Sequence, residues 1–471
     1  MAQLHESYGL DYTLVLSSNL ATESLDLQLM VAEINMYEDM FGPFMRIEVV
    51  LNDALGLIDK FPVIGEEELL FTYNIVKKLQ YTQKFKIYKV SNRTLTKARE
   101  HTVVLHGITL PGHENSLQSI YKPFIEKTPD AIVADVCQNY LNIPSGGALD
   151  FGPIQDKVLS IPVSCDKPYT KVASGQNPLQ LINFLAAESK SSKAKDYKNP
   201  SNYVFFENHI AFIYCPIDYL FDLPVDREFF LSSPQDKDQF EKGKNTYPSK
   251  SILSFKFGEQ FDNLDSVHRG AYQNELNIID PILKRFKMHP ITEKTKFQFK
   301  YNRDFDDLTH LPNSDKKYIT ADGDVGKGTK PYAAHRRMMI TQYENEGEKY
   351  QNIGYLNGKL SAGDQLNAPR QRHKHLPESL HEMENLFNHM VEVTVPGDPE
   401  LTVGQLIKIK VPQPTQFKDE TQKFLFLYGQ EATFIVTAIR HLYNGSRGSY
   451  NMVLSCSAES FGKDVEGMRV I

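Results

Sequence analysis

The amino-acid sequence predicts a mainly β fold with α+β insertions: two antiparallel β-barrel domains related by duplication, plus a small α/β middle domain. Three observations support this prediction. A pattern of short strands near the N-terminus recurs near the C-terminus, helical periodicity is concentrated in the middle, and 471 residues are too many for one ordinary domain. Hydrophobic residues make up 41% and aromatic residues 11% of the chain, which is enough to build several buried cores.

The duplication is clearest in a pair of strands. Phe85–Val90 is followed, after a polar gap, by Thr102–Leu105, and Phe434–Ile439 is followed in the same way by Asn451–Leu454. The two sets align without a gap: Phe85 with Phe434, Val90 with Ile439, and Leu105 with Leu454. A duplicated small β-unit suggests a subunit that builds a ring, rather than an enzyme organised around one pocket.

Each pair of strands is preceded by a glycine and a further strand. Val63-Ile64-Gly65 comes before Leu69–Phe71, and Thr402-Val403-Gly404 comes before Leu406–Ile409. A glycine at such a place indicates either a positive φ angle or close packing against a neighbour. We therefore expect Gly404 to be intolerant of a side chain.

Residues 1–125 are predicted to form the first β domain. Asp11–Leu16 and Leu25–Met36 show partial alternation of apolar and polar residues, which is typical of strands with one buried face. Gly42-Pro43 marks a turn, because proline fixes φ and glycine tolerates positive φ. Met45–Leu51 is the next expected strand.

Residues 126–253 are predicted to form the α/β insertion domain. Thr128-Pro129 has the residue types of a helix start, with threonine as N-cap and proline at the first position, and Asn177-Pro178 provides a second start. Apolar residues follow both starts at helical spacing. Tyr203–Phe206 and His209–Tyr214, separated by a short polar turn, predict a hairpin.

The second β domain is predicted from residues 254–300 and 391–460, with residues 301–390 inserted as an extended arm and an amphipathic helix. Tyr272–Ile279 is the expected counterpart of the Gly42–Val50 strand. The helix is expected over 376–390, where apolar residues form one stripe. Its members are Leu380, Met383, Leu386, Phe387 and Met390.

The charge balance argues against a protein that grips nucleic acid by phosphate neutralisation. The net charge is −7 and the pI about 6.1, whereas such binding needs a basic surface. An acidic balance suits a surface past which DNA slides without sticking. The first residues lack the basic and apolar regions of a secretory signal, and no apolar run approaches the ~18 residues that span a membrane. We therefore expect a soluble chain made in the cytosol.

The four cysteines lie far apart in the sequence, so no CxxC-type metal site is expected. They are Cys137, Cys165, Cys215 and Cys456. Buried free thiols in a reducing cytosol are the better interpretation.

Two short patterns suggest a nucleotide or zinc site, but both depart from the motif they resemble. Gly326–Thr329 resembles part of a phosphate-binding loop, yet Ala321, next to Asp322, stands where a Walker A motif needs its first glycine, and glycine stands where it needs Ser or Thr. His381-Glu382 lies on the predicted helix, yet Asn385 replaces the second zincin histidine, and the next histidine of that helix is His389. A flexible loop and solvated or interface residues fit these patterns better.

Polar clusters in the arm are also weak candidates for a site. Asp304, Asp306, Asp307 and His310 could hold a divalent cation, but they lack the glycine and distal glutamate of a calcium loop. The remaining candidates are His373 and His375, Arg336-Arg337, and Arg370–Lys374. Solvated residues or an acidic partner's contact surface explain these better, and the sequence contains no GxSxG motif. We predict no catalytic, cofactor-binding or metal-binding residue, and no cofactor.

The C-terminal segment resembles the closing barrel of the contractile-tail baseplate hub family. The family pattern is a helix before the barrel, a V-x-V-P-G-(D)-x-x-L-x-x-G-x-x-I stretch, and two strands of defined residue order. Here it is carried by Val393–Pro399, Leu401, Gly404, Ile407, Ile409, Tyr428-Gly429, Phe434–His441 and Tyr450–Leu454. Members include the central hub of T-even-type phages, the hub part of type VI secretion spike proteins, and late-control tail proteins. The resemblance is specific over 391–457 and extends to the whole chain by order of elements, except that the arm over 300–375 has no counterpart.

The resemblance implies a structural function. Each subunit would carry two tail-tube-like domains, and a homotrimer would present six such units around a central channel. That ring would join a threefold central spike to the sixfold tail tube and let DNA pass without specific binding. The implied partners are the spike protein, a tail tube or tube-initiator protein and other baseplate proteins, with no membrane segment. The implied place is the tail baseplate of a virion, after synthesis in the host bacterial cytoplasm.

The resemblance implies no catalysis by this chain. Because the sequence ends at Ile471 without hexapeptide-like repeats, the spike and any cell-wall hydrolase are expected to be separate polypeptides. Two alternatives stay open. One is a tail-associated cell-wall hydrolase, which would need a constellation such as Asp304, Asp306 and His310. The other is a carbohydrate-binding tail protein that uses some of the 24 tyrosines.

Overall fold

The structure is a computed structural model of the full chain. It describes residues 11–54, 56, 61, 63–75, 79–97, 100–146, 157–165, 168–191, 202–231, 251–260, 269, 273–280, 285–292, 318–319, 325–326, 335–340, 379, 383–384, 386–387, 389–411, 433–445 and 448–458.

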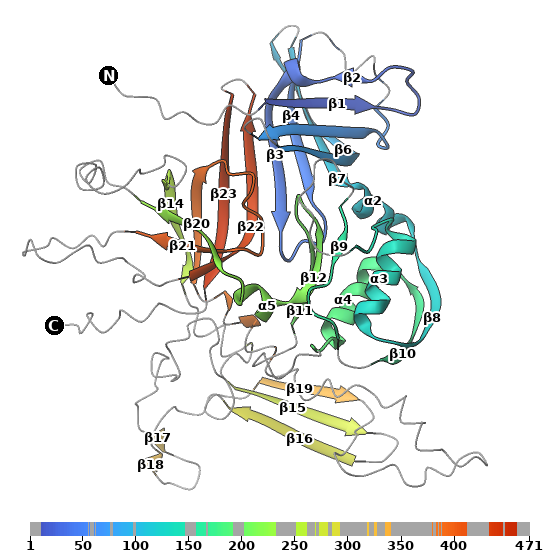
Figure 1. The fold of residues 1–471 in the computed structure, drawn as a ribbon, viewed down its shortest axis with the longest axis vertical. Coiled ribbons are helices and arrows are strands. Elements are labelled where there is room, and N and C mark those ends of the chain that lie inside the picture. Colours follow the sequence, from blue (N-terminus) through green and yellow to red (C-terminus); the bar gives the residue numbers. More distant parts are fainter. Residues whose placement is uncertain are drawn as a thin grey trace, which may run out of the picture.

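A single large sheet of 13 strands organises the molecule, in the order β14-β20-β23-β22-β3-β4-β7-β6-β5-β1-β2, with β21 beside β22 and β13 beside β21. All of its pairings are antiparallel except that of β13 with β21. The C-terminal strands β22 and β23 therefore run beside the N-terminal strands β3 and β4, in red and blue in Figure 1. The predicted fold class, mainly β with α+β insertions, is confirmed.

The N-terminal strands of this sheet form what we call the first β-unit. They are β1 (Asp11–Ser17), β2 (Leu25–Asp26), β3 (Val31–Asp39), β4 (Arg46–Asp53), β5 (Glu68–Ile75), β6 (Leu79–Lys97) and β7 (Glu100–Thr109), with a short 3-10 helix, η1 (Gln28–Met30), before β3. Alternation places one face of each strand inside: in β4 the burial pattern is eBiBiBeB, so Ile47, Val49 and Leu51 point inward.

The remaining strands form the second β-unit. They are β13 (Val225–Phe230), β14 (Ser254–Gln260), β20 (His389–Pro396), β21 (Leu406–Lys410), β22 (Thr433–Asn444) and β23 (Ser449–Ala458). One hydrophobic cluster runs through both units without a break, from Leu14 and Ile47 to Val393 and Leu454. The two units therefore share a core and cannot bury their apolar faces independently.

The two units have the same strand order, and their long hairpins have the same register over Lys86–Ser91 and Ile435–Arg440. Beyond Ser91, β6 has further register shifts that β22 does not have. Val90 lies opposite Leu105 in the β6–β7 hairpin, and the aligned residues Ile439 and Leu454 lie opposite each other in β22–β23. Both hairpins have a register shift at the aligned position, between Ile87 and Lys89 and between Val436 and Ala438. Because a β-bulge is a specific feature of a strand, its recurrence supports the duplication that the sequence predicts.

The neighbouring strands extend this correspondence. Val49 of β4 pairs with Leu105 and Val393 of β20 pairs with Leu454, so β20 is the counterpart of β4. By the same reasoning β14 corresponds to β3, and β21 to β5. Even the turn before β5 recurs, because the Glu67 side chain accepts from the Ile64 amide at 2.6 Å and the Gln405 side chain accepts from the Thr402 amide at 2.8 Å.

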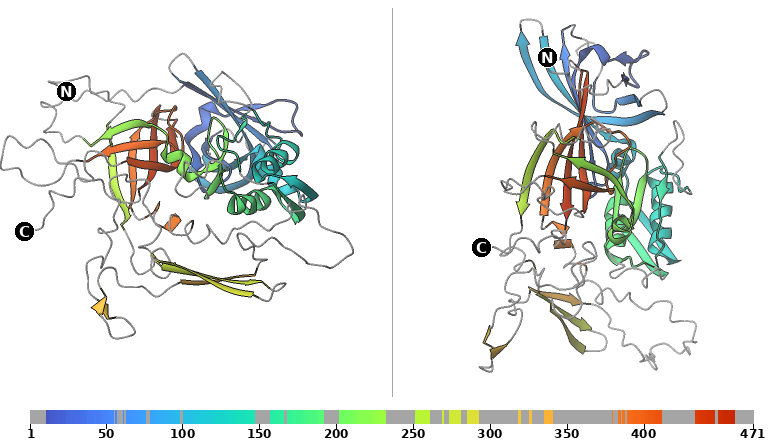
Figure 2. Two further views of the ribbon diagram at one scale, coloured as in Figure 1. Left: turned by 60° about the horizontal axis from the view of Figure 1, so that its bottom comes forward. Right: turned by 60° about the vertical axis from the view of Figure 1, so that its left-hand side comes forward.

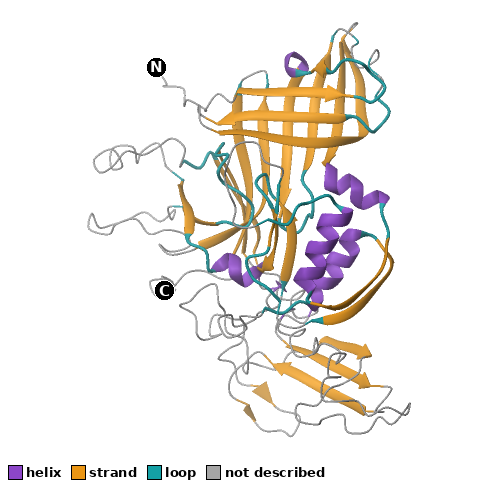
Figure 3. Cartoon of the chain, turned by 45° about the vertical axis from the view of Figure 1, so that its right-hand side comes forward, coloured by secondary structure: helices purple, strands orange, loops and turns teal. Residues whose placement is uncertain are grey.

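The insertion packs as a separate α/β body beside the sheet, on the right of Figure 1. Its elements are α2 (Leu110–Leu117), β8 (Ile120–Lys127), α3 (Pro129–Tyr140), β9 (Leu159–Ser160), β10 (Tyr169–Gln176), α4 (Pro178–Glu188), β11 (Tyr203–Glu207), β12 (Phe212–Pro216) and α5 (Ile217–Phe221). Its own apolar cluster includes Ile132, Leu181 and Phe212. Figure 3 shows α2, α3 and α4 gathered on one side of the strands.

Local sequence signals account for the helices of this body. Both expected helix starts are confirmed: Thr128 is the N-cap of α3, and Asn177 caps α4 in a capping box with Gln180. The expected hairpin is formed by β11 and β12, although His209 lies in the turn between them. β13 follows within the range predicted for the insertion, but it pairs with β21 in the large sheet.

A third sheet departs from the expectation for the second β domain. β15 (Gln273–Asp280) pairs with β16 (Arg285–Thr292) and with β19 (His335–Ile340), and it lies apart from the large sheet in both views of Figure 2. The expected equivalence of Tyr272–Ile279 with the Gly42–Val50 strand is therefore wrong, since β20 holds that position. Residues 301–390 also contain a short hairpin, β17 (Tyr318–Ile319) with β18 (Val325–Gly326).

The helix expected over 376–390 ends earlier than predicted. Among the described residues, Ser379, Met383, Glu384 and Leu386 are helical, whereas His389 and Met390 already belong to β20. Edge pairing with β23 explains the difference, because Met390 lies opposite Ser457 in an antiparallel ladder. The division into the predicted domains 1–125, 126–253, 254–300 with 391–460, and 301–390 stays a prediction.

Candidate functional site: the junction of the two β-units

One strand of the second unit, β22, pairs with strands of both units. Its first residues, Thr433–Ile435, pair with β21, and its later residues, Ala438–Asn444, pair with β3. Thr437, the bulged residue, separates the two ladders. Backbone hydrogen bonds close both ends of the β22–β3 ladder, from the Met40 amide to the Thr437 carbonyl at 2.8 Å and from the Gly445 amide to the Ala32 carbonyl at 3.0 Å.

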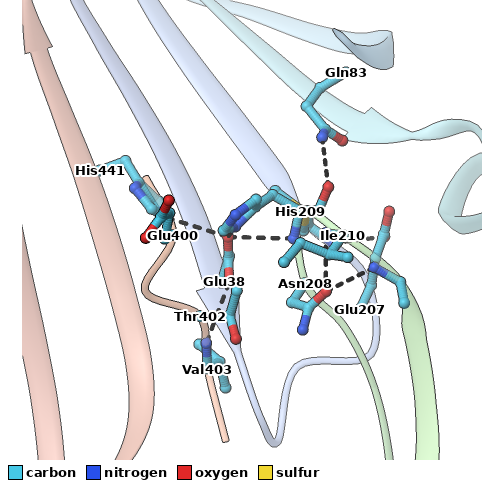
Figure 4. A network of polar contacts seen from close by, with 12 residues as sticks. Glu38, Gln83, Glu207, Asn208, His209, Ile210, Glu400, Thr402, Val403 and His441 are labelled. Atoms are coloured by element: carbon cyan, nitrogen blue, oxygen red, sulfur yellow. Dashed lines mark hydrogen bonds and ion pairs between the residues drawn. The ribbon is translucent and has the colours of Figure 1, made fainter. Parts of the chain in front are cut away.

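A buried polar cluster lies at this junction (Figure 4). Oε1 of Glu38, on β3, contacts Nδ1 of His209 at 2.6 Å and Nε2 of His441, on β22, at 3.2 Å. All three side chains are at most 1% exposed. The Glu38 carboxylate also accepts from the backbone amides of His209 at 3.3 Å and Val403 at 3.4 Å. One carboxylate thus links the first unit, the insertion and two segments of the second unit.

The His209 turn is held rigidly in place by its neighbours. The Asn208 side chain accepts from the amides of Ile210 at 2.9 Å and Ala211 at 2.7 Å, which is the usual way an asparagine stabilises a tight turn. The side-chain amide of Gln83, on β6, donates to the His209 carbonyl at 2.8 Å. The histidine is therefore fixed from the insertion and from the first unit at once.

The residue before this turn makes a second buried connection. Glu207 accepts from the Met45 amide at 2.9 Å and from the Thr109 hydroxyl at 2.6 Å, and it forms an ion pair with Lys157 at 2.7 Å. Met45 immediately precedes β4, and Thr109 is the last residue of β7. These contacts therefore attach the insertion to the first β-unit. Two buried glutamates thus fix the insertion near its turn: Glu38 contacts His209 in the turn, and Glu207 contacts the first β-unit just before it.

The cluster shifts the pKa values of its members because it is buried. Burial alone would raise the pKa of Glu38, but the charge and hydrogen bond of His209 and the hydrogen bond of His441 hold it well below its usual range. Burial lowers the pKa of His441, against the opposing effect of Glu38. His441 is oriented by Tyr450, whose hydroxyl lies 2.9 Å from Nδ1.

We expect the free energy of unfolding to fall as the pH is lowered below neutrality. His441 binds its proton more weakly in the folded chain, so below about pH 6.5 the unfolded chain takes up more protons and is favoured. Glu38 acts in the same direction at lower pH, since its folded pKa is also depressed. Urea unfolding at pH 7.5 and 5.5 measures this, and the difference should shrink in His441→Gln. Equal stability of the wild-type chain at both pH values would contradict the argument.

Two imidazoles and a carboxylate are also ligands that divalent transition metals accept. The three donor atoms lie within 4.8 Å of one another. Nδ1 of His209, Nε2 of His441 and Oε1 of Glu38 already contact one another, and these contacts join the two units and the insertion, so we assign the cluster a structural role.

Most of the candidate site residues named from the sequence lie outside the described part of the chain. Asp304, Asp306, Asp307, His310, His373, His375, His381, Glu382 and the basic stretch Arg370–Lys374 lie outside the described residues, as do Asp322 and Lys327–Thr329. Gly326 is in β18, and Arg336-Arg337 lie in β19. His389 is nearly buried on β20 rather than on a helix.

The expectation that the cysteines are buried free thiols is confirmed. All four are free and buried. Burial raises the pKa of the Cys165 thiol to about 11 and raises those of Cys137, Cys215 and Cys456 as well, so these thiols are poor nucleophiles.

Gly404 also behaves as expected. Its φ is +90°, and a Cβ there would lie 3.1 Å from the ring of Phe206. Both reasons for a glycine, a left-handed backbone and close packing, therefore apply at this position.

The fold has counterparts among solved structures. A tail protein from Neisseria meningitidis MC58 superposes with a TM-score of 0.51 at 9% identity, covering 95% of this chain and 97% of that protein. The 43 kDa tail protein of prophage MuSo2 from Shewanella oneidensis gives a TM-score of 0.50 at 10% identity, covering 94% of this chain and 97% of that protein. No protein-family model and no curated protein sequence matches the chain. The fold is therefore that of phage tail proteins.

Every helix in the described part of the chain is too short or too polar to cross a membrane.

Proposed function

We propose that this chain is a structural subunit of a contractile-tail baseplate hub, in a phage or a phage-like particle. Three copies form a ring of six β-units around a channel, which joins a threefold spike to a sixfold tail tube and lets DNA pass. Tail-protein folds in the neighbouring structures support the tail role. The sequence resemblance over 391–457 supports the hub.

The observation that carries the proposal is the internal duplication. Two units that share a hairpin register around an equivalent bulge give one chain two quasi-equivalent building blocks. In such a ring, three copies of a two-unit chain match six copies of a one-unit tube protein. A closed ring also removes exposed sheet edges, which otherwise promote aggregation. No part of this role requires catalysis, and we propose none.

The mass of the purified chain tests this function. Light scattering on the full chain, alone and co-expressed with neighbouring tail genes, is expected to give three times 53.8 kDa plus the mass of any bound partner. A persistent monomer in every combination would contradict the hub. It would favour one of two other functions, a cell-wall hydrolase or a carbohydrate-binding tail protein. Hydrolysis and glycan-binding assays on the same monomer would distinguish these two functions.

A further inference from the structure

Each β-unit has a long strand with an equivalent edge, β22 in the second unit and β6 in the first, but the β22–β3 junction within the chain uses only the edge of β22. On β22, the edge beyond the Thr437 bulge pairs with β3 of the first unit. The counterpart edge lies on β6 beyond Tyr88, and in the structure β5 pairs with β6 only from Leu79 to Lys86. The sheet path also ends at β14, the counterpart of β3, which pairs with β20. Six strands separate β14 from β6 in the sheet, so one chain carries both halves of a second junction at two distant places.

We propose that β6 of one copy pairs antiparallel with β14 of the next copy, repeating between chains the β22–β3 junction found within the chain. This inference rests on the proposed function, because it supposes that copies of the chain assemble in a ring. The contact is heterologous, since β6 and β14 are different surfaces, and repeated heterologous contacts form a ring when the rotation from copy to copy closes.

The exposure of equivalent side chains supports this pairing. Val90 is 41% exposed, whereas its counterpart Ile439 is 1% exposed because the first unit covers it. Tyr88 is 49% exposed, against 7% for its counterpart Thr437. Apolar area left open at one junction and covered at the equivalent one indicates a surface that assembly buries.

The duplication also predicts the register of the contact. Leu442 pairs with Asn35 in the β22–β3 ladder. Leu442 lies opposite Asn451, whose first-unit counterpart, Thr102, lies opposite Thr94. Although β6 has a register shift between Ser91 and Thr94 that β22 lacks, the shared partner position places Thr94 where Leu442 stands.

The other strand follows in the same way. Asn35 lies opposite Glu48, and Lys256 lies opposite Glu392, the counterpart of Glu48, so Lys256 takes the place of Asn35. The expected pair is thus Thr94 opposite Lys256 of the neighbouring copy.

This pair is suited to a disulfide test. The Met40–Thr437 and Gly445–Ala32 hydrogen bonds show that the odd-numbered residues of β22 form hydrogen-bonded pairs with β3. Leu442 and Asn35 therefore form a non-hydrogen-bonded pair, the kind whose Cα atoms lie closer together, about 4.5 Å apart. The same is expected of Thr94 and Lys256. That separation allows a disulfide. The four native cysteines are buried and should not compete.

The experiment is oxidation of the Thr94→Cys/Lys256→Cys full chain, followed by non-reducing electrophoresis and light scattering. We expect covalent species of two and three times 53.8 kDa. A matched control, Thr94→Cys/Phe255→Cys, is one residue out of register, so its thiols face opposite sides of the sheet and should not link. The pair Asn35→Cys/Leu442→Cys should link within one chain and stay at monomer mass under denaturing conditions.

The possible outcomes separate this inference from the proposed function. A trimer that links through the in-register pair and not through the control supports both. A trimer without the link, or one that links better through the control, overturns the β6–β14 pairing and leaves the hub function intact. A monomer in every preparation overturns both proposals.

Discussion

Replacing Glu38 with glutamine is expected to lower the free energy of unfolding by about 3 kcal/mol. Removing one partner from a buried charged cluster typically costs about 3–5 kcal/mol, because the groups left behind stay buried without their partner. Here four N–H groups converge on one fully buried carboxylate, from His209 twice, His441 and Val403. Glutamine keeps the size but loses the charge and turns an amide N–H toward these donors.

The matched control is Glu33→Gln on the same strand. Glu33 pairs with Arg440 at 3.4 Å, but both side chains are about a third or more exposed, so the change should be at most ~1 kcal/mol. Urea denaturation of both variants at pH 7.5 compares them directly. Glu38→Gln should also reduce the cost of His209→Gln, because the two substitutions remove the same interaction. A Glu38→Gln chain as stable as the Glu33→Gln chain would show that the cluster does not hold the junction together.

The duplication could be predicted because local sequence patterns are enough to reveal it. A hairpin needs only alternation along each strand and a turn between them, so Phe85–Val90 and Phe434–Ile439 could be matched residue by residue. The helix starts at Thr128 and Asn177 were predictable for the same reason, since capping is decided within a few residues. The sequence patterns equate Gly65 with Gly404, which is wrong by one residue. The pairing of β5 with β6 and of β21 with β22 shows that Gly65 corresponds to Val403.

Strand partners could not be predicted in the same way. Tyr272–Ile279 has a pattern that suits the position of β4, but β20, more than 100 residues further along, occupies the equivalent place. The choice depends on which distant strand completes the core, and no local pattern records that. The sequence predicts a helix at His389 for a similar reason: apolar residues continue at helical spacing past the point where pairing with β23 begins.

The Glu38 cluster was missed because its members are far apart in the sequence. One signal was present, since Glu38 is in phase with Ile34 and Met36, two residues that point into the core. A charged residue in the buried phase of a strand indicates a partner inside the protein. The identity of that partner, a histidine in a turn of the insertion and another on β22, depends on tertiary structure alone.

Gly397→Ala is expected to destabilise the chain by about 3 kcal/mol. A Cβ at this position would fall on the ring of Tyr450, closer than van der Waals contact allows. The ring cannot move aside easily, because it stacks on Tyr443 at 4.4 Å between centroids and its hydroxyl lies 2.9 Å from His441. Gly397 is not among the glycines with positive φ, so the penalty comes from overpacking alone, which costs typically about 1–3 kcal/mol and occasionally more.

A double-mutant cycle isolates this cause. In a Tyr450→Leu background the clashing ring is gone, so Gly397→Ala should cost less than about 1 kcal/mol there. Glu400→Ala, three residues along the same loop and on an exposed side chain, serves as the control for loop changes in general. Because Tyr450 orients His441, Gly397→Ala should also make stability less sensitive to pH between 7.5 and 5.5, as in His441→Gln. If Gly397→Ala is equally costly in both backgrounds, the backbone of the loop, and not the Tyr450 ring, sets the requirement for glycine.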